Sequence, residues 1–179
     1  MARAIIATIG EDRPGLVKEL SQIVHEMNLN IEDSRMAVLG GEFAVLMSVT
    51  GGSVSLDMLE ARVKELSDAS GLAYLFRTTT ERESTQVTAC VVKVEAMDHP
   101  GIVHKVAGFF SERGINIGEL ETQTEHAAHT GTPIFNLSMK VEVPTDTDIV
   151  ELSDAFYAFC EDRNLDGAVQ APSSIVTSK

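Results

Sequence analysis

Two short segments of this 179-residue chain contain groups that could hold a free amino acid. Residues 12–16 read Asp-Arg-Pro-Gly-Leu, and residues 98–102 read Asp-His-Pro-Gly-Ile. A helix that begins at the proline presents unpaired backbone N–H groups, and the glycine lets a ligand approach them closely. Such a helix start would bind a carboxylate, and the aspartate would accept hydrogen bonds from an ammonium group. Because a free amino acid carries both groups, the spacing predicts an amino-acid site.

An asparagine follows each segment at a position where a strand is expected to begin, Asn30 in the first case and Asn116 in the second. Its side chain offers both a donor and an acceptor, and we expect it to lie beside the turn. Two alternatives remain open: the aspartates cap a turn or helix, and the asparagines only complete backbone hydrogen bonds. The candidate ligand-binding residues are Asp12, Gly15, Leu16, Asn30, Asp98, Gly101, Ile102 and Asn116.

The two segments belong to an internal repeat that covers nearly the whole chain. Residues 12–17 return as 98–103, and residues 29–31 return as 115–117, in both cases 86 positions later. The apolar positions between these anchors follow the spacing of one face of a helix. Farther along, the offset grows to 92 and 93 positions, so the second copy holds about six extra residues, which lie within 123–133.

Each copy predicts the order β-α-β-β-α-β. In the first copy we expect strands at 3–9, 30–39, 42–50 and 71–79, and helices at 14–27 and 55–69. In the second we expect strands at 87–96, 116–125, 133–143 and 166–171, and helices at 100–113 and 147–162. The pair Gly40-Gly41 indicates a hairpin between two strands. This order predicts an α+β protein of two ferredoxin-like domains, each a four-stranded antiparallel sheet with two helices on one face. The domains span residues 1–80 and 87–179, with a polar linker at 81–86.

The repeated Asp-x-Pro-Gly-[Leu/Ile]-Val turn, followed by Asn-Ile at the second strand, resembles the ACT domain. The resemblance covers nearly the whole chain, twice. Residues 131–135, Gly-Thr-Pro-Ile-Phe, follow a long loop and are similar to the tandem-ACT family of glycine cleavage system transcriptional repressors. ACT domains sense small molecules, usually amino acids, and their ligand sites often lie between two domains. The resemblance implies an amino-acid-sensing regulator of glycine or amino-acid metabolism, with glycine or serine as the suspected ligand.

The charge of the chain argues against direct binding of nucleic acid. The sequence has 14 Lys and Arg residues against 27 Asp and Glu residues, a formal net charge of −13, and both copies are acidic. Nucleic-acid binding draws most of its affinity from cations that neutralise phosphates. There is no Trp and there are only two Tyr residues to stack on bases. We therefore expect no direct contact with DNA or RNA.

Other classes of function find little support in the sequence. No apolar run approaches the roughly 18 residues that a membrane span needs, and the N-terminus lacks a signal peptide, so we expect a cytoplasmic protein without membrane contact. Cys90 and Cys160 are expected to be buried thiols rather than nucleophiles. His126 and His129 lack further ligands at a fixed spacing, so we expect no metal. We also expect no cofactor and no enzymatic activity.

The chain is accordingly expected to act on a protein partner, such as a transcription factor. The alternative is a regulatory subunit of an amino-acid biosynthetic enzyme. Because residues 4–9 are apolar on both faces of their strand, we expect the two copies to pack together and the chain to form a homodimer. The candidate partner surface is acidic, unless these residues only form a solvated helix face: Asp146, Asp148, Glu151, Asp154, Glu161 and Asp162.

Overall fold

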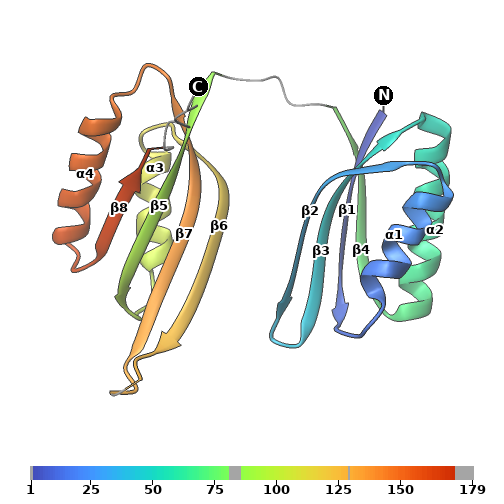
Figure 1. The fold of residues 1–179 in the computed structure, drawn as a ribbon, viewed down its shortest axis with the longest axis horizontal. Helices are drawn as coiled ribbons and strands as arrows, with labels where there is room; N and C mark the ends of the chain where they lie inside the picture. The colour runs from blue at the N-terminus through green and yellow to red at the C-terminus, as the bar shows by residue number, and fades with distance from the viewer. Residues whose placement is uncertain (1, 81–85, 129, 172–179) are drawn as a thin grey trace, which may run out of the picture. The chain divides into compact units, whose positions relative to one another are not determined.

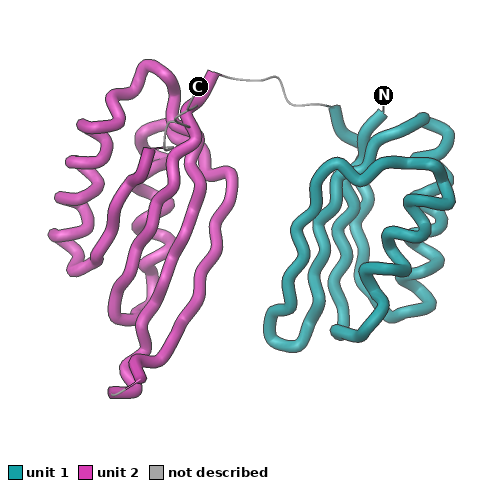
Figure 2. Tube along the Cα trace, in the orientation of Figure 1, with its two compact units in different colours: residues 1–83 teal, residues 84–179 magenta. Residues whose placement is uncertain are grey.

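The computed structural model describes residues 2–80, 86–128 and 130–171, which form two compact units (Figures 1 and 2). Unit 1 is Met1–Glu83 and unit 2 is Ser84–Lys179. Most of the linker predicted at 81–86 lies outside the described residues. Each unit is therefore a body of its own, with its own sheet and its own helices.

The two units have the same order of elements. Unit 1 contains β1 (Ala2–Glu11), α1 (Leu16–Glu26), β2 (Asn30–Leu39), β3 (Glu42–Gly51), α2 (Ser53–Ser70) and β4 (Ala73–Thr79). Unit 2 contains β5 (Val87–Met97), α3 (Ile102–Ser111), β6 (Asn116–His126), β7 (Pro133–Pro144), α4 (Ile149–Glu161) and β8 (Asp166–Gln170).

Both sheets are fully antiparallel, with the strand orders β2-β3-β1-β4 and β6-β7-β5-β8. In each unit the two helices cover one face of the sheet and leave the other face without a helix (Figure 1). The predicted α+β architecture of two ferredoxin-like domains is confirmed. The hairpin expected at Gly40 and Gly41 is also present, and both glycines have a positive φ, of 62° and 93°.

The cores form because strand and helix periodicities place apolar side chains on the same side. Ala4 and Ile6 of β1 alternate with half-buried residues, while Leu20 and Val24 of α1 lie one turn apart and face them. In unit 2 the core contains an aromatic group in which Phe109, on α3, lies within about 5 Å of the ring centroids of its aromatic neighbours. These neighbours are Phe110, Phe156 and Phe159. Each fully buried side chain of this size contributes about 1.5–3 kcal/mol.

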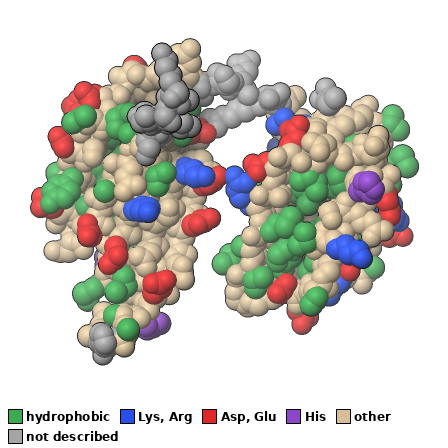
Figure 3. Space-filling view, in the orientation of Figure 1, with side chains coloured by type: hydrophobic (Ala, Val, Ile, Leu, Met, Phe, Trp, Pro, Cys, Tyr) green, Lys and Arg blue, Asp and Glu red, His purple; other side chains and the backbone are tan. Residues whose placement is uncertain are grey.

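The helix-free faces of the two sheets differ in chemistry. In unit 1 this face exposes four large apolar side chains: Ile9, Leu39, Leu46 and Leu75. Figure 3 shows a band of hydrophobic side chains on unit 1. The corresponding face of unit 2 is polar, and its Lys140 forms an ion pair with Glu119 at 2.8 Å. The expectation that the apolar face of unit 1 packs against another sheet or chain stays a prediction.

Candidate ligand site at the turn between β1 and α1

The turn between β1 and α1 owes its shape to Gly15, which precedes the first helical residue. Its φ of 102° lies in a region that is costly for residues with a Cβ atom, and Gly101 before α3 has a φ of 94°. Because neither glycine can belong to a right-handed helix, α1 begins at Leu16 rather than at Pro14 as expected. In unit 2 the helix likewise begins two residues after the predicted proline.

Each turn forms a backbone hydrogen bond with the hairpin that follows it in the sequence. The N–H of Asp12 donates to the carbonyl of Gly41 at 3.1 Å, and the N–H of Asp98 donates to the carbonyl of Pro133 at 3.1 Å. The hairpin of β2 and β3 therefore positions the aspartate of unit 1, and the longer hairpin of β6 and β7 positions that of unit 2. The local sequence repeats because the same backbone path is built twice.

The starts of α1 and α3 have no side-chain cap within the described part of the chain. In contrast, Asp148 caps α4, where its Oδ1 accepts hydrogen bonds from the N–H groups of Val150 at 2.8 Å and Glu151 at 3.2 Å. Neither Asp12 nor Asp98 caps its helix, because Gly15 and Gly101 occupy the N-cap positions, and a role of the aspartates in the turn stays a prediction. The first-turn N–H groups of both helices are available to an external acceptor such as a carboxylate.

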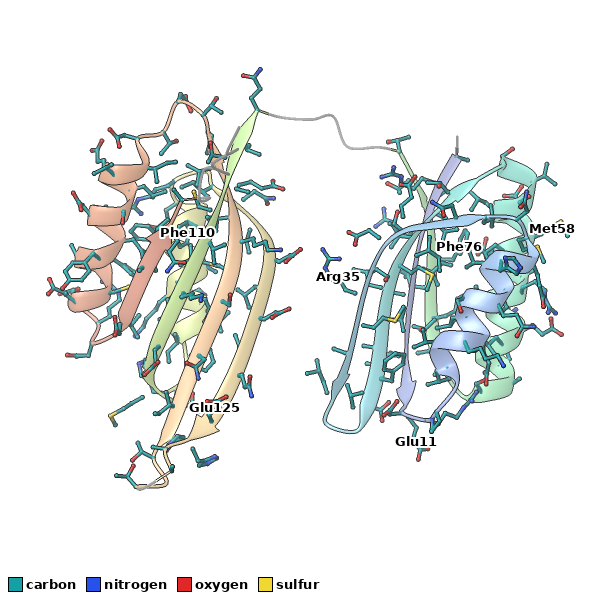
Figure 4. All side chains as sticks on the ribbon, viewed as in Figure 1. Glu11, Arg35, Met58, Phe76, Phe110 and Glu125 are labelled. Carbon is teal, nitrogen blue, oxygen red and sulfur yellow. The ribbon has the colours of Figure 1, made fainter. Side chains whose placement is uncertain are left out.

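A pocket lies at this turn in unit 1. Its lining consists of the turn, the first turn of α1 and one aromatic residue of β3: Asp12, Arg13, Pro14, Gly15, Leu16, Val17, Lys18, Ser21 and Phe43. The Asp12 side chain is exposed and forms no hydrogen bond or ion pair with the other described residues. Glu11, labelled in Figure 4, lies one residue away at the end of β1 and is not part of the lining. The pocket thus combines helix N–H groups with an unpaired carboxylate.

Charged neighbours distinguish the turns of the two units. Arg13 donates to both carboxylate oxygens of Glu19 at 2.7 Å and to the hydroxyl of Ser70 at 3.2 Å. The hydrogen bond from Arg13 lowers the pKa of Glu19, and that of Arg13 is raised in turn. In unit 2, His99 and Lys105 occupy the positions equivalent to Arg13 and Glu19, so the turn has no such pair. The Nδ1 of His99 instead donates to the carbonyl of Pro100 at 3.1 Å.

The two asparagines were expected to lie beside the turns, but in the structure they do not. Asn30 pairs with Thr50, which pairs with Arg3 at the start of β1, whereas Asp12 follows the end of that strand. Glu11 lies eight positions after Arg3, a distance of about 26 Å along an extended strand. The turn and the asparagine of unit 1 are therefore too far apart for one free amino acid to contact both.

Local partners are visible at the start of the second strands. The Nδ2 of Asn116 donates to Glu142 Oε2 at 2.8 Å. In unit 1 the hydroxyl of Thr50 donates to Glu32 at 3.0 Å, beside a register shift between β2 and β3. A shift at the equivalent place in β6 repeats this irregularity, which the sequence analysis missed because a one-residue bulge leaves no periodic signal. A ligand role for Asn30 or Asn116 stays a prediction.

The remaining reactive groups lie in the core or on separate surfaces. Cys90 and Cys160 are free and buried, and burial raises the pKa of Cys160 to about 11. Among the described residues, no three His, Cys, Asp or Glu side chains gather as metal ligands would. His129, one of the two histidines considered for a metal, lies outside the described residues.

Comparison with known families supports the repeat. An ACT domain model matches residues 2–77, and a second ACT domain model matches residues 91–152. The chain is a tandem ACT-domain protein. The predicted resemblance is confirmed, and each match begins in the first strand of its unit.

The tandem ACT-domain protein is similar over most of its length to a known regulator. It is 28% identical to the glycine cleavage system transcriptional repressor of Escherichia coli over 166 residues, which are 92% of this chain and 87% of that protein. A UPF0237 protein of Methanopyrus kandleri is 36% identical over 74 residues, which are 40% of this chain and 82% of the relative.

Solved structures show the same similarity. One is the crystal structure of a protein assigned as a glycine cleavage system transcriptional repressor, whose sequence is 26% identical. The two structures match with a TM-score of 0.75 over 97% of this chain and 98% of that protein's chain. The structure of an unknown protein from Galdieria sulphuraria, which is 27% identical, matches with a TM-score of 0.77 over 96% of this chain and 99% of that protein's chain. Within its described part, the ACT-domain protein has no helix long and apolar enough to cross a membrane.

Proposed function

We propose that this protein senses a small amino acid and, through a protein partner, regulates transcription of genes for glycine or amino-acid metabolism. The ACT domains and the similarity to a glycine cleavage system transcriptional repressor support a regulator that senses amino acids. The name of that relative makes glycine, or the closely related serine, the ligand to test first.

A single observation carries the proposal: the pocket of unit 1 holds complementary groups for the two charged ends of an amino acid. The uncapped N–H groups at the start of α1 would bind the ligand carboxylate, with the positive end of the helix dipole behind them. Asp12 would accept hydrogen bonds from the ligand ammonium group.

A protein partner fits the charge of the chain better than DNA does. With a net charge of −13, the protein repels a phosphate surface and attracts a basic face on a DNA-binding regulator. Three of the six acidic residues considered for this contact have local partners. Asp148 caps α4, Asp162 pairs with Arg163 at 3.0 Å, and Glu161 interacts with the side chain of Tyr157. The other exposed candidates for partner contact are Asp146, Glu151 and Asp154.

Calorimetric titration of the full chain with glycine, serine and the other amino acids tests the ligand site. Asp12→Ala should weaken binding by about 10- to 150-fold, because a hydrogen bond to a charged group contributes about 1.5–3 kcal/mol. Glu11→Ala is the matched control, since it removes an exposed carboxylate one residue away and outside the pocket. If both variants bind like the wild type, the turn is not the ligand site.

The partner is tested by affinity capture from native cells with and without the amino acid that binds. We expect a DNA-binding regulator in the eluate, in an amount that changes with the ligand, because a ligand shifts only states that it binds unequally. Capture of a biosynthetic enzyme would favour a regulatory subunit instead. A specific complex of the purified chain with operator DNA at physiological salt would contradict the protein-partner mechanism.

A further inference from the structure

Each unit has a groove between its two helices, on the side of the helices that faces away from the sheet. In unit 1 the groove is lined by Glu19, Gln22, Ile23, Glu26, Arg62, Glu65, Leu66 and Ala69. In unit 2 the groove is lined by His104, Lys105, Gly108, Phe109, Glu112, Arg113, Ala155, Phe159 and Arg163. We call them the acidic groove and the basic groove, because their charges are of opposite sign.

One charged position that the repeat makes equivalent has opposite signs in the two grooves. The acidic groove has three glutamates against Arg62, and the basic groove has one lysine and two arginines against Glu112. Glu19 of α1 and Lys105 of α3 are 86 positions apart, which is the offset of the repeat, so one site has changed sign between the copies. A basic surface is unexpected in a chain with a net charge of −13.

The arginines of the basic groove are held in place before any partner arrives. Arg113 donates from Nη1 to the carbonyl of Phe109 at 2.8 Å, and its guanidinium lies 3.7 Å from the centroid of that ring. Arg163 makes the same two contacts with Phe159. Its Nη1 donates to the carbonyl of Phe159 at 3.2 Å, and its guanidinium lies 4.1 Å from the centroid of the Phe159 ring. Arg163 also pairs with Asp162 at 3.0 Å. Each guanidinium still has further N–H donors for an incoming carboxylate and loses little side-chain freedom on binding.

Gly108 opens the basic groove further. It lies inside α3, where glycine costs about 0.5–1 kcal/mol relative to alanine, and a Cβ at this position would meet no atom within 4 Å. Packing within unit 2 therefore does not require a glycine here. A residue without a side chain lets a second helix approach the backbone closely, and the equivalent position in the acidic groove is Gln22.

Glu26 and Glu65 of the acidic groove are only weakly held by their present partner, whereas Glu19 is held through both carboxylate oxygens by Arg13. Arg62 contacts Glu65 at 2.6 Å and Glu26 at 3.9 Å, and all three side chains are exposed. Exposed pairs of this kind contribute about 0–1 kcal/mol, so they can exchange for better oriented cations. Arg113 and Arg163, already fixed over their aromatic rings, are such cations.

We infer that the basic groove of unit 2 docks the acidic groove of unit 1 from a second copy of this chain. Charge complementarity favours this occupant, because both halves of the match are grooves of the same kind on equivalent helix pairs. The interface would use the helix faces and leave the apolar sheet face of unit 1 free. It would also weaken as ionic strength rises.

Sedimentation equilibrium of the full chain tests this interface through charge reversal. Lys105→Glu, or Glu65→Lys, should each raise the dimer dissociation constant at least tenfold at low salt. The two substitutions combined in one chain should recover most of the loss, since they restore opposite charges across the interface. Lys64→Glu and Glu60→Lys are matched controls on α2, because they change the charge equally at exposed positions outside both grooves.

Circular dichroism of every variant verifies that the fold is intact, which is expected because the altered side chains are exposed. A wild-type chain that stays monomeric at high micromolar concentration would overturn the inference. So would a dimer whose dissociation constant is the same in the groove variants and the α2 controls, or single variants whose losses simply add in the double variant. Binding of the basic groove to an acidic peptide, without any self-association, would assign the groove to another partner and also overturn it.

Discussion

Two glycines of unit 2 should respond to the same substitution in opposite directions. Gly167 lies in β8, where a Cβ would meet Cys160 Sγ at 2.6 Å, Phe156 Cε1 at 3.1 Å and Val94 Cγ2 at 3.3 Å. Phe156 is fully buried and Cys160 is 1% exposed, so these side chains have no free space to enter. Gly167→Ala should therefore destabilise unit 2 by about 1–3 kcal/mol through overpacking.

The same substitution at Gly108 should stabilise unit 2. A Cβ there meets nothing within 4 Å, and alanine has a lower conformational entropy in the unfolded chain and a higher helix propensity than glycine. The expected gain is about 0.5–1 kcal/mol. The pair is a matched comparison, because both variants add one methyl group to the same unit.

Native-state hydrogen exchange of the full chain measures these effects unit by unit. The slowest amides of β5 and β7 report the opening free energy of unit 2, and those of β1 and β3 report unit 1. Both variants should leave the unit 1 values unchanged. If Gly167→Ala leaves the opening free energy of unit 2 within about 0.5 kcal/mol of the wild type, the packing argument at β8 is refuted.

Two further predictions concern titratable groups. Cys90 and Cys160 should resist alkylation at pH 8 in the native protein and react fully in denaturant. The reason is that both thiols are buried and the pKa of Cys160 is raised to about 11. Rapid modification of the native chain would contradict this prediction. Loss of stability from ionising Cys160 should begin above the ordinary thiol pKa and continue through about pH 11, since burial favours the neutral form. Arg13→Ala should raise the pKa of Glu19 measured by NMR toward its ordinary value, because the hydrogen bond from Arg13 lowers it. That bond stabilises the turn above the ordinary glutamate pKa and is lost as pH falls through the lowered value, so an unchanged Glu19 titration would show the pair to be absent in solution.

Most element positions were predictable, because their signals are local and occur twice. β2 begins at Asn30 and ends at Leu39 as predicted, since the strand starts after a helix and stops at the Gly40-Gly41 hairpin. The helices were also predictable from their apolar spacing, although both predicted proline starts were two residues early. A proline is compatible with the first helical position. However, Gly15 follows Pro14 and has a left-handed backbone conformation, so α1 can begin only after Gly15.

The placement of the asparagines was not predicted, although the order of elements contained the needed signal. A helix that returns antiparallel to β1 delivers the chain to the far end of the sheet, so β2 must begin beside the start of β1. Proximity in the sequence is therefore not proximity in space at this motif. The pairing of Asn30 with Thr50 shows that the direction of the strands, rather than the motif, decides which polar groups meet.

By itself, the sequence determined the repeat, the class of fold, the buried faces and the turn that could bind an amino acid. Each of these depends on periodicity or on short spacing, which local residue types record directly. Only the tertiary structure decided that the turns lack a helix cap, that the asparagines lie at the other end of the sheet, and that the helix pairs form grooves of opposite charge. These features join residues far apart in the chain: α1 with α2 in the acidic groove, and α3 with α4 in the basic one. Charges 50 residues apart, such as Arg113 and Arg163, share a surface only because packing on a common sheet brings their helices together.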